Sequence, residues 1–379
     1  MKIVTIVGAR PQFIKAAPVS RALRERGLDE FLLHTGQHYD PALSQVFFDE
    51  LDLQPPDANL EAGSGRHGEQ TAAMLAGIER CLLEQRPDWV LIYGDTNSTV
   101  AGALAAVKLH LPVAHVEAGL RSFNRRMPEE INRVVADAVA DLLFLPTETA
   151  RRNLEREGVP AGRLVWTGDV MYDAALQFRE KALRVSRAVE RLGLTEGGYA
   201  LSTVHRAENT DDPARLQALM EGLGRVAETL PVVLPLHPRT RAALRRHGIE
   251  PPARLTLIEP VGFLDMVRLE AGARVVATDS GGVQKEAFFH GVPCVTLREE
   301  TEWTELVTAG WNRLCPPTNA AAVAAAIRAA AENRPSARET FYGDGQAARI
   351  IAETLATRGL EPPHREPSGA QRRLHRGDS

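Results

Sequence analysis

Residues 274–290 read RVVATDSGGVQKEAFFH, and this stretch decides the fold. Its apolar, β-branched segment 275–278 predicts a buried parallel strand, which breaks at the Asp-Ser-Gly-Gly of residues 279–282 before a helix begins at Val283. Two glycines at a strand-to-helix turn let the backbone approach a ligand closely, and the positive end of the helix dipole favours an anion. The stretch is typical of a phosphate site, although an ordinary turn with an Asp or Ser cap explains a lone Ser-Gly-Gly equally well.

Alternating strand and helix patterns extend from this stretch in both directions and predict a doubly wound, parallel α/β fold. In the first half, the expected strands lie near residues 3–7, 31–34, 89–93, 113–117, 142–145 and 164–167. In the second half, they lie near residues 199–203, 232–236, 255–259, 275–278 and 292–297. The expected helices include residues 12–26, 69–85, 99–109, 129–140, 320–332 and 345–358.

The strand pattern stops around residues 169–189, and the 379-residue chain is long enough for two α/β domains. We therefore expect a first domain over residues 1–168 and a second over residues 169–342. An amphipathic segment over residues 343–360 closes the folded part. Residues 361–379 are polar and rich in Pro, Gly and Arg, so we expect a disordered tail.

Composition excludes several classes of function. A formal net charge of −4 argues against a general nucleic-acid surface. The three cysteines, Cys81, Cys294 and Cys315, have neither a paired metal spacing nor a disulfide pattern, which favours a reduced cytoplasmic setting. Every apolar run is shorter than the ~20 residues that span a bilayer, so we expect no membrane insertion.

Polar residues follow the first-half strands, at the sheet edge where α/β folds bind ligands. Arg10 and Lys15 follow the first strand and suit a phosphate or a substrate carbonyl. Asp95 follows the third strand, Glu117 follows the fourth, and Glu129 opens the next helix. Each acid alone is a weak signal, because Asp95, for example, also reads as a helix cap. Together they predict three carboxylates at one edge, where crowding can shift pKa values toward acid–base catalysis.

The second half places different groups at the corresponding edge. His205 and Arg206 follow one strand and His237 follows the next, although such a histidine is often only a hydrogen-bonded loop residue. Glu286 lies one turn inside the predicted helix, where an acid can reach a ribose hydroxyl. Acids in one half and a predicted phosphate-binding loop in the other suit a substrate that is linked to a nucleotide. No GxGxxG follows the first strand and no GxxxxGK[ST] occurs, which argues against dinucleotide redox chemistry and P-loop hydrolysis.

Six motifs, in this order and spacing, resemble those of the non-hydrolysing UDP-N-acetylglucosamine 2-epimerases. They are GARPQFIK (8–15), YGDTNST (93–99), HVEAGLRS (115–122), MPEEINR (127–133), STVHRAEN (202–209) and TDSGGVQKEA (278–287). The resemblance covers roughly residues 1–358. It implies a GT-B-like fold in which two Rossmann-like domains face a cleft and the C-terminal helix crosses back to the first domain.

The resemblance also implies an activity, the interconversion of UDP-GlcNAc and UDP-ManNAc with no added cofactor and no metal. By that route, UDP leaves C1 as the C2 proton is removed, and UDP then adds back to 2-acetamidoglucal as a proton returns to the other face. Such an enzyme is expected to be a cytoplasmic homodimer that supplies polysaccharide biosynthesis.

Matching the motifs position by position implies a role for individual residues. The expected catalytic residues are Asp95, Glu117, Glu129 and His205. The expected sugar contacts are Lys15 and Arg133. The expected contacts to the diphosphate and ribose are Arg10, Ser280, Gly281, Gly282 and Glu286.

A second, allosteric UDP-GlcNAc site is also implied by the resemblance, at Gln37, Arg206 and His237. The sequence departs from the family pattern there, because Asp40 replaces an expected Gln and Glu69 an expected Arg. An acid facing a diphosphate weakens anion binding, unless Arg66 compensates.

Three alternatives remain open on the sequence. A GT-B glycosyltransferase also needs a nucleotide-sugar loop, but it needs an acceptor pocket and usually only one essential base. A relative that hydrolyses its product would release free N-acetylmannosamine. A catalytically silent nucleotide-sugar sensor has no need of the acids and His205.

Overall fold

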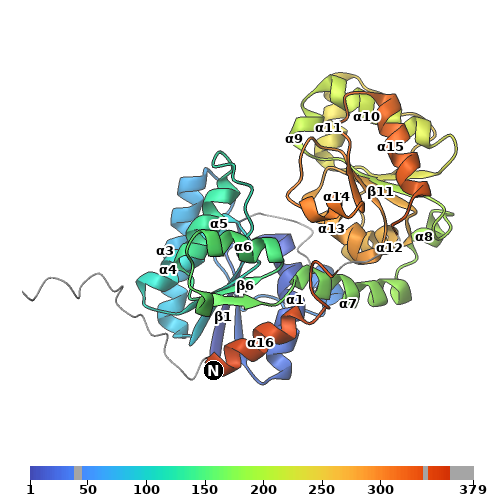
Figure 1. Cartoon of the computed structure of the whole chain (residues 1–379). Coiled ribbons are helices and arrows are strands. Elements are labelled where there is room, and N and C mark those ends of the chain that lie inside the picture. Colours follow the sequence, from blue (N-terminus) through green and yellow to red (C-terminus); the bar gives the residue numbers. More distant parts are fainter. Residues whose placement is uncertain (38–44, 336–339, 359–379) are drawn as a thin grey trace, which may run out of the picture.

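Two parallel sheets, one in each half of the chain, form the framework of the protein. The computed structural model describes residues 1–37, 45–335 and 340–358. Asp40 and the predicted disordered tail lie outside the described residues. Figure 1 shows the two halves as separate lobes, with α7 (Val170–Val185) at their junction.

The first lobe contains a seven-stranded sheet in the order β3-β2-β1-β4-β5-β6-β7, and every pair is parallel. Its strands are β1 (Lys2–Val7), β2 (Asp29–His34), β3 (Ala58–Asn59), β4 (Trp89–Tyr93), β5 (Val113–Val116), β6 (Leu142–Leu145) and β7 (Leu164–Trp166). Its helical segments are α1 (Arg10–Glu25), α2 (Gln45–Leu51), α3 (His67–Gln85), α4 (Asn97–Lys108), α5 (Pro128–Val139), α6 (Glu148–Arg156) and the 3-10 turn η1 (Ala161–Arg163).

The second lobe contains a six-stranded parallel sheet in the order β10-β9-β8-β11-β12-β13. Its strands are β8 (Ala200–Thr203), β9 (Val232–Pro235), β10 (Thr256–Ile258), β11 (Val275–Thr278), β12 (Cys294–Thr296) and β13 (Asn312–Leu314). The helices that follow α7 are α8 (Ala188–Arg191), α9 (Ala207–Thr210), α10 (Pro213–Val226), α11 (Pro238–His247), α12 (Phe263–Gly272), α13 (Gly281–His290), α14 (Thr304–Thr308), α15 (Ala320–Glu332) and α16 (Ala347–Arg358).

Helices cover both faces of each sheet, which explains why the central strands are apolar throughout. Along β4, alternate side chains enter two different cores: Leu91 joins the core that contains α1, and Ile92 joins the core that contains α3 and α4. This period of two is what a strand buried on both faces requires. The predicted doubly wound α/β architecture is confirmed.

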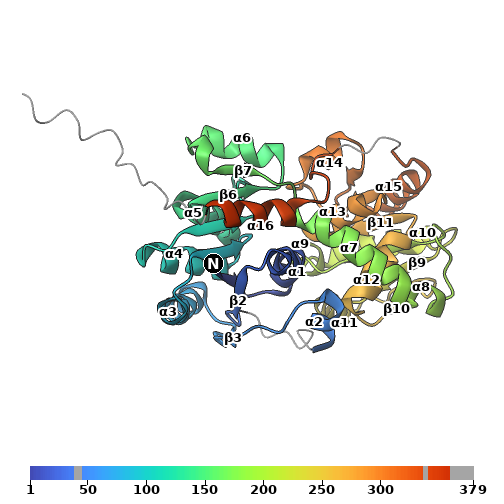
Figure 2. The same cartoon turned by 90° about the horizontal axis from the view of Figure 1, so that it is seen from below.

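The last helix, α16, returns to the first lobe, as predicted (Figures 1 and 2). Ile351 and Leu355 of α16 are fully buried in the core that contains α1, and Arg26 forms an ion pair with Glu353. At its N-terminus, the Asp173 carboxylate on α7 accepts hydrogen bonds from the backbone N–H groups of Ala347 and Ala348, at 3.2 and 2.8 Å. Burial raises the pKa of this carboxyl to about 6.

The two crossings of the chain between the lobes touch each other. The Asp169 N–H donates to the Tyr342 carbonyl at 3.0 Å. Gly168 has a φ of +79°, and a Cβ atom there would lie 2.6 Å from the same carbonyl oxygen, so the crossing requires glycine. The exact domain boundaries, at residues 168/169 and 342/343, stay a prediction.

Some local predictions were wrong. Helix α13 begins at Gly281 rather than Val283, so both glycines belong to its first turn. Strand β5 ends at Val116, which places Glu117 in the following turn rather than in the strand. The short strands β3 and β13 were not predicted. Within the described residues, no helix is both long and apolar enough to cross a membrane.

Candidate active site

The N-terminus of α13 in the second lobe is open toward the cleft between the lobes. Ser280 is the N-cap residue, and its side chain makes no capping hydrogen bond. The expected Asp or Ser cap is therefore absent, and the backbone N–H groups at Gly281 and Gly282 keep the geometry of an anion site. Gly281 is fixed from its other side, because the Trp303 indole N–H donates to its carbonyl at 2.9 Å.

Asp279 has a different role from the predicted cap. Its fully buried carboxylate accepts hydrogen bonds from the backbone N–H groups of His205 and Arg206, each at 3.0 Å, and from the Asn209 amide at 3.1 Å. These bonds tie the loop after β8 to the turn before α13. Asp279 thus positions His205 and Arg206 beside the open helix end.

The carboxyl end of β4 presents Asp95 to the cleft. The Arg133 guanidinium on α5 donates to this carboxylate at 2.5 Å, and the Asn132 amide donates to the Asp95 backbone carbonyl at 2.9 Å. Desolvation in the cleft raises the pKa of Asp95, and Glu117 raises it further, whereas Arg133 and Lys15 oppose the shift. Asp95 is therefore the acid of this edge that is biased toward its protonated form.

Glu117, just after β5, has the opposite bias. It adopts a left-handed backbone conformation, φ +68°, which is uncommon for a non-glycine residue and is often found at functional sites. One carboxylate oxygen accepts from the Lys15 ammonium at 2.7 Å, and the other lies 3.8 Å from the Lys285 ammonium. Although burial opposes ionisation, Lys15 and Lys285 lower the pKa of Glu117 to about 2. Gly94 has a φ of +62°, and a Cβ there would lie 3.4 Å from Lys15.

A buried network behind Glu117 fixes the turn that carries it. His115 on β5 directs one ring nitrogen to the Asp137 carboxylate and the other to the Gly94 carbonyl, both at 2.7 Å. Two acceptors require two N–H donors, so this geometry suits a protonated imidazole. Asp137 also accepts from the Gly119 N–H at 3.0 Å and from Arg121 at 2.7 Å.

The adjacent glutamates of α5 differ in environment. Glu129 is exposed and faces the cleft, whereas Glu130 is buried. The Glu130 carboxylate accepts from the backbone N–H groups of Ser122 and Phe123, at 2.9 and 3.0 Å, and forms an ion pair with Arg133. Glu130 therefore holds the loop before α5, while Glu129 remains accessible for chemistry.

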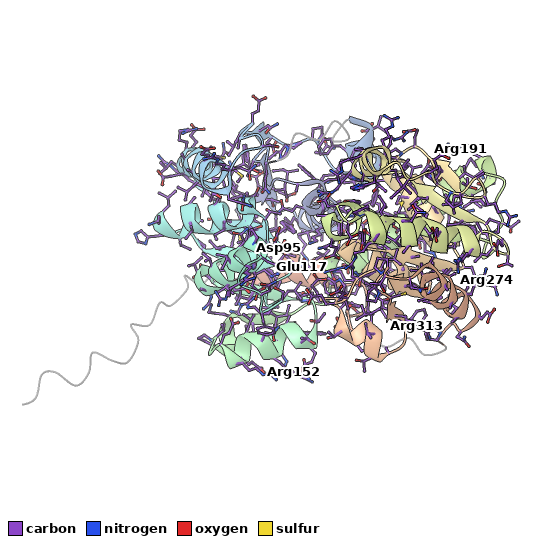
Figure 3. All side chains as sticks on the ribbon, turned by 90° about the horizontal axis from the view of Figure 1, so that it is seen from above. Asp95, Glu117, Arg152, Arg191, Arg274 and Arg313 are labelled. Atoms are coloured by element: carbon purple, nitrogen blue, oxygen red, sulfur yellow. The ribbon has the colours of Figure 1, made fainter. Side chains whose placement is uncertain are left out.

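The two lobes enclose a cavity of about 510 Å³. Most of the residues predicted for the site line it: Lys15, Asp95, Glu117, Glu129, Arg133, Arg206, Ser280, Gly281, Gly282 and Glu286. Figure 3 shows Asp95 and Glu117 side by side near the centre of the molecule, whereas the labelled arginines Arg152, Arg191, Arg274 and Arg313 lie around its periphery. The structure thus brings the predicted acids and the predicted phosphate loop into one cavity.

Four predicted residues are not among those that line this cavity. The Arg10 guanidinium packs over the Phe47 ring, 5.2 Å from its centroid. Burial raises the pKa of Glu286, and the charges of Lys285 and Arg10 oppose that shift. The half-exposed His205 ring lies 5.3 Å from the His237 ring, centroid to centroid. Gln37 belongs to the first lobe, where its side-chain carbonyl accepts from the Ser98 N–H at 2.9 Å.

Sequence reasoning missed Asp169 and Lys285, which form a buried ion pair at 2.5 Å. Lys285 stands inside the quoted stretch, one residue before Glu286, but nothing in a local pattern shows that it meets a residue 116 positions away. The same holds for Asp279, whose partners lie on the turn after β8. The only sequence signal of this ion pair was the residue type, since a lysine on the buried side of a helix requires an anionic partner.

Comparisons with known proteins agree with this geometry. The family model described as UDP-N-acetylglucosamine 2-epimerase matches residues 21–356. The UDP-2,3-diacetamido-2,3-dideoxy-D-glucuronate 2-epimerase of Pseudomonas aeruginosa is 51% identical over 361 residues, which cover 94% of this chain and 99% of that protein.

Solved structures are similar along nearly the whole chain. The UDP-GlcNAc 2-epimerase of Methanocaldococcus jannaschii, in complex with UDP-GlcNAc and UDP, has a TM-score of 0.85 and 41% identity, and covers 94% of this chain and 100% of that one. The enzyme of Neisseria meningitidis, bound to UDP-GlcNAc, has a TM-score of 0.84 and 30% identity over the same shares of the two chains.

Proposed function

Because the chain belongs to the UDP-N-acetylglucosamine 2-epimerase family, we propose that it interconverts UDP-GlcNAc and UDP-ManNAc. One observation carries the proposal: Asp95, Glu117 and Glu129 line the same cavity as the open N-terminus of α13. A sugar whose diphosphate is bound at that helix end lies against the carboxylates. Family membership makes the chain an epimerase, so the glycosyltransferase alternative loses its support.

The proposed reaction is an elimination followed by an addition. A carboxylate takes the C2 proton, the electrons of the C2–H bond form the C1–C2 double bond, and UDP leaves C1 with its bonding pair. UDP then adds back to C1 of 2-acetamidoglucal, while a carboxylic acid returns a proton to the opposite face of C2. Each cycle ends with the same number of protons on the enzyme, and no oxidant, reductant or metal is needed.

The pKa values of Asp95 and Glu117 are shifted in opposite directions, which suits one proton donor and one proton acceptor. Groups whose environments push their pKa values apart are natural partners as acid and base. Glu117, held ionised by two ammonium groups, is the proposed proton acceptor in one direction. Asp95, whose pKa is raised, is the proposed donor, and Glu129 is the third exchangeable acid at the rim. In the reverse direction the two roles exchange.

The remaining predicted residues are proposed to bind the substrate. Backbone N–H groups and the hydroxyl at residues 280–282 are placed for the diphosphate, with Arg10 and Arg206 close by. Glu286 is proposed to accept from the ribose hydroxyls. Lys15 and Arg133, each already paired with a reacting carboxylate, can also donate to sugar oxygens. His205, fixed through its backbone by Asp279, is proposed to act at the same helix end.

A second substrate is suggested by the Pseudomonas aeruginosa relative, whose substrate is a UDP-diacetamido-glucuronate. That sugar carries an extra carboxylate, which needs a cation. Four of the cations that line the cavity are already paired with acids of this chain: Lys15, Arg121, Arg133 and Lys285. The fifth, Arg206, lies beside the phosphate loop. This distribution of charge favours UDP-GlcNAc, whose sugar carries no carboxylate.

Allosteric activation by a second UDP-GlcNAc also stays a proposal. Its predicted residues have structural contacts of their own: Gln37 binds Ser98, and the His237 ring accepts from the Arg239 N–H at 3.1 Å. Glu69, which departs from the family pattern, is exposed on the first turn of α3, and Arg66 is exposed at its N-cap. A sigmoidal dependence of rate on UDP-GlcNAc concentration would support activation, and a hyperbolic one would exclude it.

The decisive experiment offers the purified protein each nucleotide sugar separately and follows the anomeric signals by proton NMR. We expect UDP-ManNAc from UDP-GlcNAc, with slower or no conversion of UDP-2,3-diacetamido-2,3-dideoxy-glucuronate. If the uronate is converted faster than UDP-GlcNAc, the uronate is the better assignment of the substrate. Free N-acetylmannosamine would indicate a hydrolysing enzyme, and a homodimer would appear as a doubled mass in solution.

A further inference from the structure

Lys285 joins the two lobes at the point where both crossings of the chain meet. It lies in the second turn of α13, on the nucleotide-binding side of the cleft, and its side chain is 4% exposed. Its ammonium lies 2.5 Å from the Asp169 carboxylate and 3.8 Å from the free oxygen of Glu117. It also packs over the Trp303 ring, 4.1 Å from the centroid. One cation of the second lobe thus contacts the reacting edge of the first.

A buried ammonium is stable only with compensating negative charge. Asp169 provides one full partner, so Glu117 is not required for that purpose. The result is a row of alternating charges, Lys15, Glu117, Lys285 and Asp169, in which Glu117 stands between two cations. Within the described residues, the Glu117 oxygen that faces Lys285 has no hydrogen-bond partner. That buried oxygen therefore depends on the Lys285 ammonium, 3.8 Å away, for compensating charge.

We propose that Lys285 is a positioning residue of the epimerase reaction, which fixes the orientation and the negative charge of Glu117 from the nucleotide-binding helix. The proposal rests on the function proposed above. Lys285 and the proposed diphosphate site belong to the same short helix, α13. A diphosphate that binds at the N-terminus of this helix therefore also fixes the position of the Lys285 ammonium beside Glu117. Nucleotide binding is thereby linked to the orientation of the Glu117 carboxylate, one oxygen of which lies 3.8 Å from the Lys285 ammonium.

Several other charged groups face this pair and contribute to its titration. They are Lys15 on α1, Asp95 after β4, His115 on β5, Asp169 at the start of α7 and Glu286 on α13. Loss of the Lys285 charge leaves Lys15 as the one cation in direct contact with Glu117 among the described residues. The Glu117 carboxylate then holds a proton up to a higher pH, so the base form requires a higher pH.

The test compares Lys285→Met and Lys285→Arg with the unaltered enzyme, measuring kcat and KM from pH 4 to pH 9. We expect Lys285→Met to lower kcat by about 10- to 100-fold throughout this range, because the pKa of Glu117, about 2, lies below it and the loss is one of orientation. KM and the Kd for UDP should change by less than about threefold, because the N-terminal N–H groups of α13 are retained. Lys285→Arg, which keeps the charge, should restore most of kcat.

Two further variants separate positioning from stability. Lys285→Met with Asp169→Asn removes both members of the buried ion pair, which commonly leaves stability unchanged or improved. An asparagine at residue 169 can still accept from the Met171 N–H, as Asp169 does at 2.8 Å. We expect the double variant to fold normally and to keep the lowered kcat with a nearly unchanged KM. The matched control is Lys181→Met. Lys181 forms an ion pair with Asp52 at the lobe junction and does not line the cavity that contains Asp95 and Glu117.

A double variant with unaltered kcat would overturn the proposal and leave Lys285 with a purely structural role. A loss of UDP affinity as large as the loss of kcat would do the same. Failure of the function itself is distinguishable, because the unaltered enzyme would then epimerise neither nucleotide sugar. In that case the proposed role of Lys285 falls with it.

Discussion

The two lobes bring charge to the same cavity in opposite ways. In the first lobe, the carboxylates that we propose to react are held by side-chain cations, Glu117 by Lys15 and Asp95 by Arg133. In the second lobe, the buried carboxylate of Asp279 is satisfied largely by backbone N–H groups, and the end of α13 keeps its own N–H groups uncapped. The first lobe therefore brings paired carboxylates to the cavity, and the second adds the fixed dipoles of backbone N–H groups beside Lys285 and Glu286.

The difference follows from what each ligand group needs. Proton transfer requires side chains that change charge, and close counter-ions tune them without moving the backbone. A diphosphate keeps its charge throughout the reaction, so rigid backbone N–H groups bind it without any titration. Changes to the first-lobe carboxylates should therefore affect turnover, and changes at the diphosphate and ribose contacts of the second lobe should affect binding or stability. Lys285, which lies beside Glu117 of the first lobe, is the expected exception.

The largest effect is expected from Glu117→Gln in the first lobe. The amide cannot accept the C2 proton, so kcat should fall by roughly 10²–10⁴-fold, whereas the Kd for UDP should stay nearly the same. Turnover by NMR and binding by calorimetry check the two halves of this prediction. Asp95→Asn should behave alike, and Glu25→Gln on the exposed face of α1 serves as the control. Near-normal turnover of both acid variants would contradict the statement that the first-lobe carboxylates determine turnover.

Glu286→Gln is the matching change in the second lobe. The amide keeps one oxygen acceptor and loses the other, and one lost hydrogen bond, about 1–1.5 kcal/mol, should raise the Kd for UDP by about tenfold. We expect kcat at saturating substrate to change much less, because no proton passes through this residue. A large drop in kcat with unchanged UDP binding would place Glu286 among the reacting groups and contradict its assignment.

Asp279→Asn tests the backbone side of the comparison. An asparagine turns an N–H₂ group toward a site that contains only donors, so we expect a loss of about 1–3 kcal/mol in the free energy of unfolding. Urea denaturation of this variant, beside Asp212→Asn at the exposed start of α10, measures the difference. Equal stability of the two variants would show that Asp279 does not hold the loop after β8.

The junction between the lobes should give the smallest effect at neutral pH. In Asp173→Asn, the loss of hydrogen bonds to α16 is offset by removal of a desolvated charge, so the net change should be within about 1 kcal/mol. The pKa of Asp173 is raised from 3.8 to about 6, so the folded state binds the extra proton between these values. Stability should therefore decline as pH rises through this window, and the variant should lack that slope. An identical slope in both proteins would contradict the assignment.

Much of the framework was predictable from periodicity. Strands β4, β6 and β11 have the predicted bounds, because each is a continuous, mainly apolar run closed by polar, glycine or proline residues. Strands β3 and β13, of two and three residues, were missed because they are too short to show a period. Helix α13 begins two residues early, since nothing in Gly281 and Gly282 distinguishes a turn from the first turn of a helix.

The candidate site was predictable where its residues follow strand ends in order. Asp95 and Glu117 lie together because the carboxyl ends of parallel strands share an edge of the first sheet, and Ser280, at the corresponding edge of the second sheet, lines the same cavity. The partners that set their charge were not predictable, since the Lys285–Asp169 pair joins positions 116 apart across the two lobes. Opposite pKa shifts of neighbouring carboxyls depend on such distances, and a sequence pattern contains none.

The most direct test of the account is proton NMR of the protein with UDP-GlcNAc in deuterated water. The account predicts UDP-ManNAc that carries deuterium at C2 from the earliest time points, with no cofactor added, because carboxyl groups in the cleft exchange their protons with solvent. An epimer that keeps protium at C2 throughout, or the absence of any epimer, would contradict it.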